Sequence, residues 1–206
     1  MILETVCVGP LEANCYILAE KEGSTAIIID PGHEERRIKN ALKKHGLNPA
    51  FIINTHGHID HIGCDDKFGV PVYIHSRDER LLNDPGLNLS SLLSAPFKVR
   101  SKVLTLEEGQ LIENGGLALE VIHTPGHTPG GICLLMKKPK DNILFTGDSL
   151  FCQSIGRADF PGADEGSLIS ALKEKILKLN DDVIIYPGHG PSSTIRDEKR
   201  GNPFLR

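Results

Sequence analysis

The sequence has no tryptophan, and aromatic residues make up only 5% of its 206 residues. It lacks an apolar run long enough to cross a bilayer, so a membrane-embedded protein is not expected. The formal net charge of −4 provides no basic surplus. This argues against nucleic acid as a partner and against a polybasic membrane anchor. The composition therefore favours a globular protein without a nucleic-acid or membrane partner, and it does not specify an oligomeric state.

The cysteines also exclude certain classes of protein. There are five, an odd number, and none form a Cys-x-x-Cys pair. A disulfide framework or a thiolate zinc ribbon is therefore not expected. The first residues carry Glu4 and Glu12 among apolar neighbours and no basic segment, unlike a signal peptide. We expect a cytoplasmic protein with one domain over residues 1–206, because no linker or low-complexity stretch divides the chain.

Short apolar segments alternate with segments of helical periodicity in both halves of the chain. The predicted strands are residues 2–8, 14–19, 25–30, 51–54, 71–75, 117–123, 132–136, 143–146 and 183–186. The predicted helices are residues 34–45, 77–82 and 166–179, with a further short helix ending near Phe68. This order suits an α/β fold with sheets in the middle and helices outside. The apolar, serine-rich stretch within residues 84–105 is expected to be a mobile flap or lid.

Several predicted strands end in histidine or aspartate residues flanked by glycine. Residues 55–61 follow one strand and hold four such side chains, and three later strands are each followed by one more. Loops at strand ends are where a rigid scaffold presents reactive groups, so we expect these side chains to converge. The seven are His56, His58, Asp60, His61, His127, Asp148 and His189.

The spacing of the first four suits metal binding. Residues two apart in an extended segment point the same way, so His56 and His58 can hold one ion, with Gly57 leaving room between them. Asp60 and His61 fall at an expected helix start and can face a second ion. All donors are nitrogen or oxygen, which favours zinc, iron or manganese over a closed thiolate site. Seven ligands suit two ions with open positions, bridged by a carboxylate such as that of Asp148.

Two adjacent ions acidify a bound water and polarise a carbonyl, which is the chemistry of ester, thioester, amide or phosphodiester hydrolysis. The sequence has no Gly-x-Ser-x-Gly nucleophile elbow, so a serine hydrolase is disfavoured. The alternative, a coincidental polar turn, is disfavoured by four metal-competent side chains within six positions. Asp30 is either a turn former or a partner that orients a ligand histidine, and the sequence leaves both open.

These motifs resemble the metallo-β-lactamase superfamily, and most closely its short, single-domain glyoxalase II-like (hydroxyacylglutathione hydrolase-like) branch. The resemblance is carried by THGHIDH, TPGHT, FTGD and YPGHG, with further matching segments in order along nearly the whole chain. It implies a four-layer αββα sandwich built from two related halves. It also implies a first metal ion on His56, His58 and His127, a second on Asp60, His61 and His189, and Asp148 bridging both.

The resemblance further implies a hydrolase of small acyl thioesters, such as S-D-lactoylglutathione, with two divalent ions. Zinc is the expected metal, with iron or manganese as other options. A hydroxide between the ions would attack the thioester carbonyl, and Asp60 would orient this nucleophile or handle a proton. Arg157 matches a basic residue that binds the glycine carboxylate of glutathione. Its alternative role is a surface or structural salt bridge.

The chain departs from the usual glyoxalase II pattern in three places. Gly57 replaces a third consecutive histidine, Asp159 stands where an aromatic glutathione contact is expected, and the last motif reads GHGPSSTI instead of ending in GHDY. A rival interpretation is a persulfide dioxygenase, a related family in which two histidines and one aspartate hold a single iron. Those ligands would be His56, His127 and Asp148. The GHGPSSTI ending favours the hydrolase.

Overall fold

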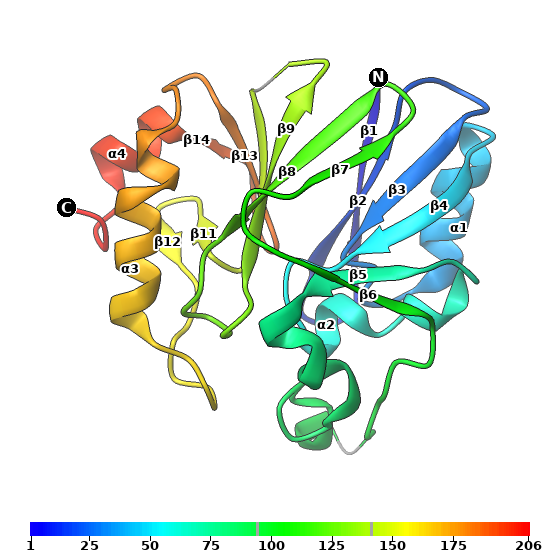
Figure 1. Cartoon of the computed structure of the whole chain (residues 1–206), viewed down its shortest axis with the longest axis horizontal. Coiled ribbons are helices and arrows are strands. Elements are labelled where there is room, and N and C mark those ends of the chain that lie inside the picture. Colours follow the sequence, from blue (N-terminus) through cyan, green and yellow to red (C-terminus); the bar gives the residue numbers. More distant parts are fainter. Residues whose placement is uncertain (94, 141) are drawn as a thin grey trace.

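The computed structural model describes residues 1–93, 95–140 and 142–206. Two six-stranded sheets lie face to face, and helices cover their outer faces (Figure 1). Helix α1 covers one sheet, and helices α3 and α4 cover the other. The layers therefore run helix, sheet, sheet, helix, which confirms the predicted αββα sandwich.

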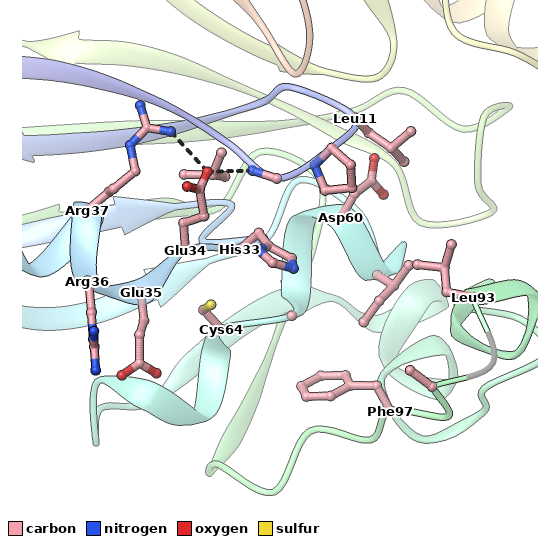
Figure 2. Close-up of a pocket in the computed structure, with 17 residues that line it drawn as sticks. Leu11, His33, Glu34, Glu35, Arg36, Arg37, Asp60, Cys64, Leu93 and Phe97 are labelled. Carbon is pink, nitrogen blue, oxygen red and sulfur yellow. Dashed lines mark hydrogen bonds and ion pairs between the residues drawn. The ribbon is translucent and has the colours of Figure 1, made fainter.

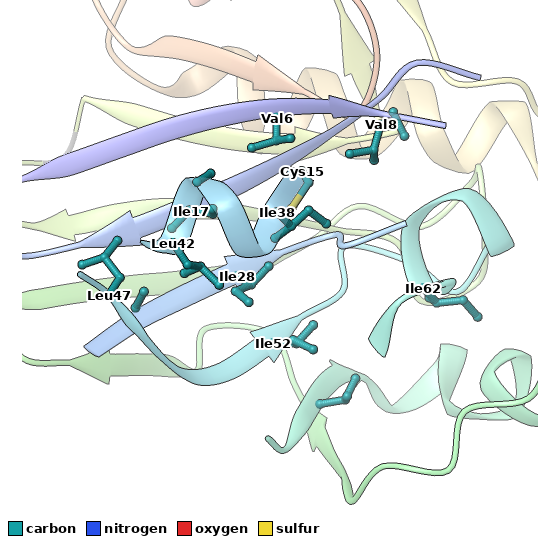
Figure 3. Packing of buried hydrophobic residues seen from close by; sticks show 14 of the residues in the cluster. Val6, Val8, Cys15, Ile17, Ile28, Ile38, Leu42, Leu47, Ile52 and Ile62 are labelled. Atoms are coloured by element: carbon teal, nitrogen blue, oxygen red, sulfur yellow. The ribbon is translucent and has the colours of Figure 1, made fainter. Parts of the chain in front are cut away.

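The first half of the chain forms one sheet in the order β1-β2-β3-β4-β5-β6. Its strands are β1 (Ile2–Val8), β2 (Ala13–Ala19), β3 (Thr25–Ile29), β4 (Asn48–Ile53), β5 (Val72–His75) and β6 (Val103–Leu106). Strands β3 to β6 are parallel, whereas β1 and β2 pair antiparallel with their neighbours. Helix α1 (Glu35–Lys44) buries Ile38, Ala41 and Leu42 against this sheet. Figure 3 shows Ile38 and Leu42 beside Ile17 and Ile28 of the strands.

The second half forms the other sheet in the order β14-β13-β10-β9-β8-β7. Its strands are β7 (Leu111–Asn114), β8 (Leu117–His123), β9 (Ile132–Lys138), β10 (Ile143–Gly147), β13 (Ile184–Pro187) and β14 (Ser193–Thr194). The hairpin β11 (Leu150–Phe151) and β12 (Ser154–Ile155) follows β10. Helices α3 (Glu165–Glu174) and α4 (Ile195–Gly201) lie outside this sheet, with the 3₁₀ turn η4 (Ile176–Lys178) between them in sequence.

The inner strands are apolar on both faces because both faces are buried. In β2, Ile17 packs towards α1, whereas Leu18 packs between the two sheets. In β3, Ile28 packs towards α1 and Ile29 packs between the two sheets. Alternate residues of a strand point to opposite faces, so a strand between a helix and a second sheet needs apolar residues throughout. Phe145 of β10 is among the largest fully buried side chains in the core between the sheets.

One edge of the sandwich is tied together by hydrogen bonds between the two sheets. The hydroxyl of Tyr16 donates to the carbonyl of Pro187 at 2.6 Å, and the backbone N–H of Asn14 donates to the carbonyl of Gly188 at 2.7 Å. The N–H of Ile132 donates to the carbonyl of Thr55 at 2.9 Å. These bonds fix the loops that follow the strands of both sheets relative to each other.

The sequence prediction was wrong for several elements outside the central strands. The predicted helix over 77–82 is the 3₁₀ helix η2 (Ser76–Asn83), and the predicted helix over 166–179 is divided into α3 and η4. The short helix predicted to end near Phe68 is one α-helical turn, α2 (Ile59–Ile62), followed by the 3₁₀ turn η1 (Asp65–Lys67). The prediction missed the short elements β6, β7, β14 and α4. Within the described residues, no helix combines the length and apolarity needed to cross a membrane.

The segment predicted as a lid is ordered at both ends. Asn88 is buried, and its amide donates to the carbonyls of Leu81 at 3.0 Å and Phe97 at 3.1 Å. The segment then ends in β6, which extends the sheet. Between these anchors, the 3₁₀ turn η3 (Ser90–Leu93) leaves Leu93 59% exposed. Ser94 lies outside the described residues, and the mobility of this segment stays a prediction.

Two histidines outside the predicted ligand set form a stacked pair. His75 at the end of β5 and His123 at the end of β8 lie with ring centroids 4.0 Å apart and planes 9° apart. Burial, together with His123, lowers the pKa of His75 from 6.5 to about 4. The folded protein thus binds this proton less readily than the unfolded chain. The stability due to neutral His75 is therefore complete above pH 6.5 and lost as the pH falls towards 4.

A His75→Phe substitution tests this pH dependence, because it keeps an aromatic ring beside His123 and removes the titrating group. We expect the free energy of unfolding of the parent protein to fall more steeply between pH 6.5 and pH 4 than that of the variant. Urea titrations across this interval measure the difference. Parallel curves for the two proteins would show that His75 makes no contribution to acid sensitivity.

Candidate metal centre

The structure brings all seven predicted ligands to the edge where β3, β4, β10 and β13 end. Each comes from a segment that follows a strand, and α2 supplies two of them directly after the loop that follows β4. Their donor atoms form three overlapping groups in which all atoms lie within 4.8 Å of one another. Two of these groups share no residue and are called the first and the second group below: His56, His58 and His127; and Asp60, His61 and His189. The remaining group, His56, His61 and Asp148, joins them.

The first group is formed by three buried histidines. Nδ1 of His58 lies 2.9 Å from Nε2 of His127. The rings of His56 and His58 lie at 90° to each other, with centroids 4.8 Å apart. Only 1%, 4% and 5% of the surfaces of His56, His58 and His127 are exposed. Since this pocket is almost closed to water, its nitrogen atoms need partners within it.

The second group is more open and contains a carboxylate. Nε2 of His61 lies 3.3 Å from Nε2 of His189. Oδ2 of Asp60 lies 3.3 Å from Nε2 of His189 and 3.7 Å from Nε2 of His61. Helix α2 places Asp60 and His61 side by side in sequence, as the predicted helix start required. The side chains of Asp60 and His189 are 20% and 26% exposed, so solvent or a ligand can approach from this side.

Asp148 lies between the two groups. Its Oδ1 is 3.4 Å from Nε2 of His61, and its Oδ2 is 3.5 Å from Nε2 of His127 and 3.6 Å from Nε2 of His189. The carboxylate thus faces histidines of both groups at once. This is the geometry expected of a carboxylate that bridges two ions.

The second nitrogen of each of four imidazole rings has a partner outside the cluster. Nδ1 of His127 donates to the carbonyl of Arg157 at 2.7 Å, and Nδ1 of His189 donates to the carbonyl of Leu11 at 2.9 Å. Nδ1 of His61 lies 3.0 Å from Oδ2 of Asp30, and Nδ1 of His56 lies 3.2 Å from Oγ1 of Thr55. Partners of this kind fix the tautomer and ring orientation of metal-binding histidines.

Asp30 connects two of these rings. Its Oδ1 accepts the backbone N–H of Thr55 at 2.7 Å, and its Oδ2 accepts the Thr55 hydroxyl at 2.6 Å. Because that hydroxyl donates to Asp30, its oxygen is left to accept the Nδ1–H of His56. Of the two roles that the sequence left open for Asp30, the contacts show the orienting one.

The arrangement leaves several lone pairs directed into the cluster. When both rings are neutral and Nδ1 of His61 and His189 donates elsewhere, their two Nε2 atoms face each other as acceptors at 3.3 Å. Nε2 of His56 and Oδ1 of Asp148 are buried without a hydrogen-bond partner among the described residues. Orphaned acceptors are costly in a protein interior, and a bound cation would satisfy them all. The nitrogen and oxygen atoms of the cluster therefore fit two metal ions.

The electrostatics agree with this fit. Burial, reinforced by the surrounding histidines, lowers the pKa of His56 well below its usual range and that of His58 to about 3, so both present neutral nitrogen atoms. Burial opposes charge on His61, but Asp60, Asp148 and Asp30 outweigh it and raise the pKa of His61 to about 10. This part of the cluster thus strongly favours positive charge.

Two glycines allow the close approach of these elements. A Cβ on Gly188 would collide with Oδ1 of Asp148 and lie 2.9 Å from Cε1 of His61. A Cβ on Gly57 would meet the Cβ of Leu81 in η2. The third histidine of the usual glyoxalase II motif would therefore not fit at Gly57, and its absence removes no ligand.

Sequence analysis missed Asp78, a buried carboxylate that links the two ligand loops. It accepts the N–H of Gly57 at 3.1 Å, between His56 and His58 in sequence. It also accepts the Thr128 hydroxyl at 2.7 Å and the Gly130 N–H at 2.6 Å, in the loop that carries His127. No metal-binding motif marks Asp78, so only the tertiary structure identifies it.

An Asp78→Asn substitution is expected to destabilise the protein and loosen the first group of histidines. An amide has one acceptor oxygen in place of two, so at least one buried donor loses its partner. We expect the free energy of unfolding to fall by about 2 kcal/mol and metal affinity by roughly tenfold. Urea unfolding and competition with a chelator measure these losses. Glu79→Gln, at the exposed neighbouring position, should change neither, and equal effects of the two variants would contradict this role for Asp78.

The structure places Arg157 at the edge of the site. Its side chain is 68% exposed, forms two hydrogen bonds to Asp159 at 2.9 and 2.7 Å, and lies 4.5 Å from the centre of the Phe160 ring. Its backbone carbonyl is the partner of His127. The salt bridge that sequence analysis gave as the alternative is therefore present, and the contact with a substrate carboxylate stays a prediction.

The profile of the Metallo-beta-lactamase superfamily matches residues 8–189, from the end of β1 to the last predicted ligand. The chain belongs to this superfamily. Hydroxyacylglutathione hydrolase GloC of Haemophilus influenzae is 37% identical over 218 residues, covering 100% of this chain and 98% of that protein. The metallo-beta-lactamase superfamily consists mainly of hydrolytic enzymes, and the centre described above is consistent with this chemistry.

Two solved structures are similar over almost their whole length. The BLEG-1 B3 metallo-beta-lactamase is 38% identical with a TM-score of 0.89, covering 99% of both chains. TTHA1623 in a di-iron-bound form is 36% identical with a TM-score of 0.85, covering 98% of this chain and 100% of that one. The printed names of these relatives include a hydroxyacylglutathione hydrolase, a B3 metallo-beta-lactamase and a protein in a di-iron-bound form. Superfamily membership therefore establishes a metallo-hydrolase fold but neither the substrate nor the metal.

Proposed function

We propose that this chain is a glyoxalase II-like hydrolase that uses two metal ions to cleave small acyl thioesters. The observation that carries the proposal is the position of Asp148, whose two oxygens face histidines of both donor groups. The GloC relative supports a thioester as the substrate class, because its name is that of a thioester hydrolase and it matches the whole chain.

In this proposal each donor group holds one ion. His56, His58 and His127 hold the first, and Asp60, His61 and His189 hold the second. Asp148 holds both. When bound, two adjacent divalent ions supply a water that is ionised near neutral pH and a Lewis acid for the substrate carbonyl.

Asp60 has a further role in the proposal. Its carboxylate belongs to the more exposed group and also lines a groove beside the site. The neighbouring His61 and His189 outweigh its burial and hold the pKa of Asp60 below its usual range, so it is a carboxylate at neutral pH. A carboxylate there can orient a water molecule by accepting one of its protons.

We propose zinc as the physiological metal. The donors are imidazole nitrogen and carboxylate oxygen, which suit zinc but also iron or manganese. The experiment must distinguish zinc from iron, because the structure of TTHA1623 is of a di-iron-bound form.

The test combines metal analysis with a substrate panel. Protein purified without added metal is expected to carry about two ions per chain, mainly zinc, by elemental mass spectrometry, and to hydrolyse S-D-lactoylglutathione or other acyl thioesters. About one iron per chain, with oxygen consumption in the presence of glutathione persulfide, would replace the proposal by a persulfide dioxygenase. Faster turnover of a β-lactam than of every thioester would also overturn it.

A further inference from the structure

A groove of about 900 Å³ opens beside the metal centre (Figure 2). The turn between β1 and β2, the start of α1 and helix α2 contribute its walls, together with Leu93, Ala95 and Phe97. Asp60 lines the groove and also belongs to the second donor group. Leu11 lines it as well, and the carbonyl of Leu11 is the partner of His189. The groove is therefore continuous with the centre where the reaction would occur.

The end of the groove nearest to Asp60 is apolar. Figure 2 shows Leu11, Leu93 and Phe97 around the same end as Asp60. Leu11 and Leu93 are 57% and 59% exposed, and they are two of the six large apolar side chains that are exposed among the described residues. Large apolar side chains gathered at a concave site next to a few polar groups are typical of a ligand pocket.

The other end of the groove carries charges that compensate one another. Figure 2 shows Glu34, Glu35, Arg36 and Arg37 away from Leu93 and Phe97. The carboxylate of Glu34 accepts from Arg37 and from the N–H of Gly9, both at 2.9 Å. Two acidic and two basic side chains give no net attraction for an anion. The two carboxylates of glutathione would find little charge complementarity here, whereas a hydrocarbon chain would be well accommodated.

We propose that this groove binds the acyl group of the substrate, and that the preferred acyl groups are apolar chains of medium length. The inference rests on the proposed thioester hydrolysis and narrows its substrate class. In that reaction, the oxygen of a water molecule bonds to the acyl carbon, the carbon–sulfur bond breaks, and the sulfur leaves as a thiol with one proton of the water. With the carbonyl beside Asp60, the chain extends along Leu11, Leu93 and Phe97, and the thiol carrier leaves on the opposite side.

Chain-length dependence of hydrolysis is the first measurement. The substrates are acetyl, butanoyl, hexanoyl and octanoyl thioesters of N-acetylcysteamine, which share one small neutral carrier. We expect kcat/KM to rise by up to about fourfold for each added methylene that the groove buries. Equal kcat/KM values for the acetyl and octanoyl thioesters would overturn the inference.

Variants locate the effect in the groove. Leu93→Ser and Phe97→Ser should remove most of the preference for octanoyl over acetyl. Leu93 is exposed, so its replacement is compatible with folding even if Phe97→Ser is not. Leu111→Ser is the matched control, because Leu111 is 56% exposed on β7 and does not line the groove. A preference retained in Leu93→Ser, or lost equally in Leu111→Ser, would overturn the assignment.

Binding of octanamide to the metal-free protein separates this inference from the proposed function. Octanamide is a neutral probe, and calorimetry should detect binding to the parent protein that Leu93→Ser weakens several-fold and Leu111→Ser does not. If this pattern is found but no thioester is hydrolysed, the apolar groove is supported and the proposed function is wrong. If thioesters are hydrolysed without chain preference and octanamide does not bind, the proposed function stands and the groove inference fails.

Discussion

Replacing Asp148 by alanine is expected to lower kcat/KM for a thioester by about a thousandfold or more and to reduce metal content from about two ions per chain. The physical reason is that this carboxylate is the one side chain in the cluster whose two oxygens face histidines of both groups. Without it, His61, His127 and His189 lose the negative charge between them. Two adjacent cations then repel each other with less compensation.

Metal analysis and kinetics on the same preparation measure this effect. Asp148→Asn keeps the shape of the side chain and removes its charge, so metal content and activity should fall between those of the parent and the alanine variant. Asp182→Ala removes an exposed carboxylate elsewhere and should leave both unchanged. Parent-like metal content and turnover in Asp148→Ala would exclude a bridging role.

The convergence of the seven predicted ligands could be expected from sequence, because each has a metal-competent side chain in a segment that follows an apolar strand. His189 illustrates this: residues 183–186 predict a strand, the observed β13 is Ile184–Pro187, and the Gly-His that follows must lie at its end. Strands β3 and β4 are parallel, as are β10 and β13, so their carboxyl ends share an edge. Asp30, at the end of β3, belongs to this edge, but only the observed contacts distinguish its orienting role from that of a turn former.

Elements that depend on tertiary pairing could not be predicted in this way. Strands β6 and β7 are the outermost members of their sheets and have four residues each, too few to show periodicity. Asp78 lies within Ser76–Asn83, whose charged sequence suggests an exposed helix. It is buried because donors of Gly57 and Gly130, 21 and 52 residues away, converge on it. A contact between residues this far apart leaves no pattern in the local sequence.

An Asp30→Asn substitution is expected to weaken metal binding by 10- to 100-fold, although Asp30 belongs to neither donor group. The backbone of Asp30 has φ of +52°, a conformation that asparagine tolerates, so the chain can keep its path. The side chain cannot keep its contacts. In the parent protein, Oδ2 of Asp30 accepts from Nδ1 of His61 at 3.0 Å and from the Thr55 hydroxyl at 2.6 Å. In the variant, an amide NH₂ would take the place of Oδ2 and would face these two hydrogen-bond donors. The His61 ring would then lose its acceptor, and the Thr55 hydroxyl beside His56 would lose the acceptor that orients it.

Chelator competition measures the affinity, and nitrogen NMR of the His61 ring reports its tautomer, which a general loss of stability would not change.

The matched control is Asp65→Asn. Asp65 is also fully buried, but burial raises its pKa well above the usual range, which favours the neutral acid that an amide imitates. Its Oδ1 accepts from the Asn54 amide at 3.3 Å, and that contact can survive the substitution. We therefore expect Asp65→Asn to retain parent affinity and the parent His61 tautomer. If both variants weakened metal binding equally, the effect would follow from changing any buried carboxyl near α2, and the orienting role of Asp30 would be wrong.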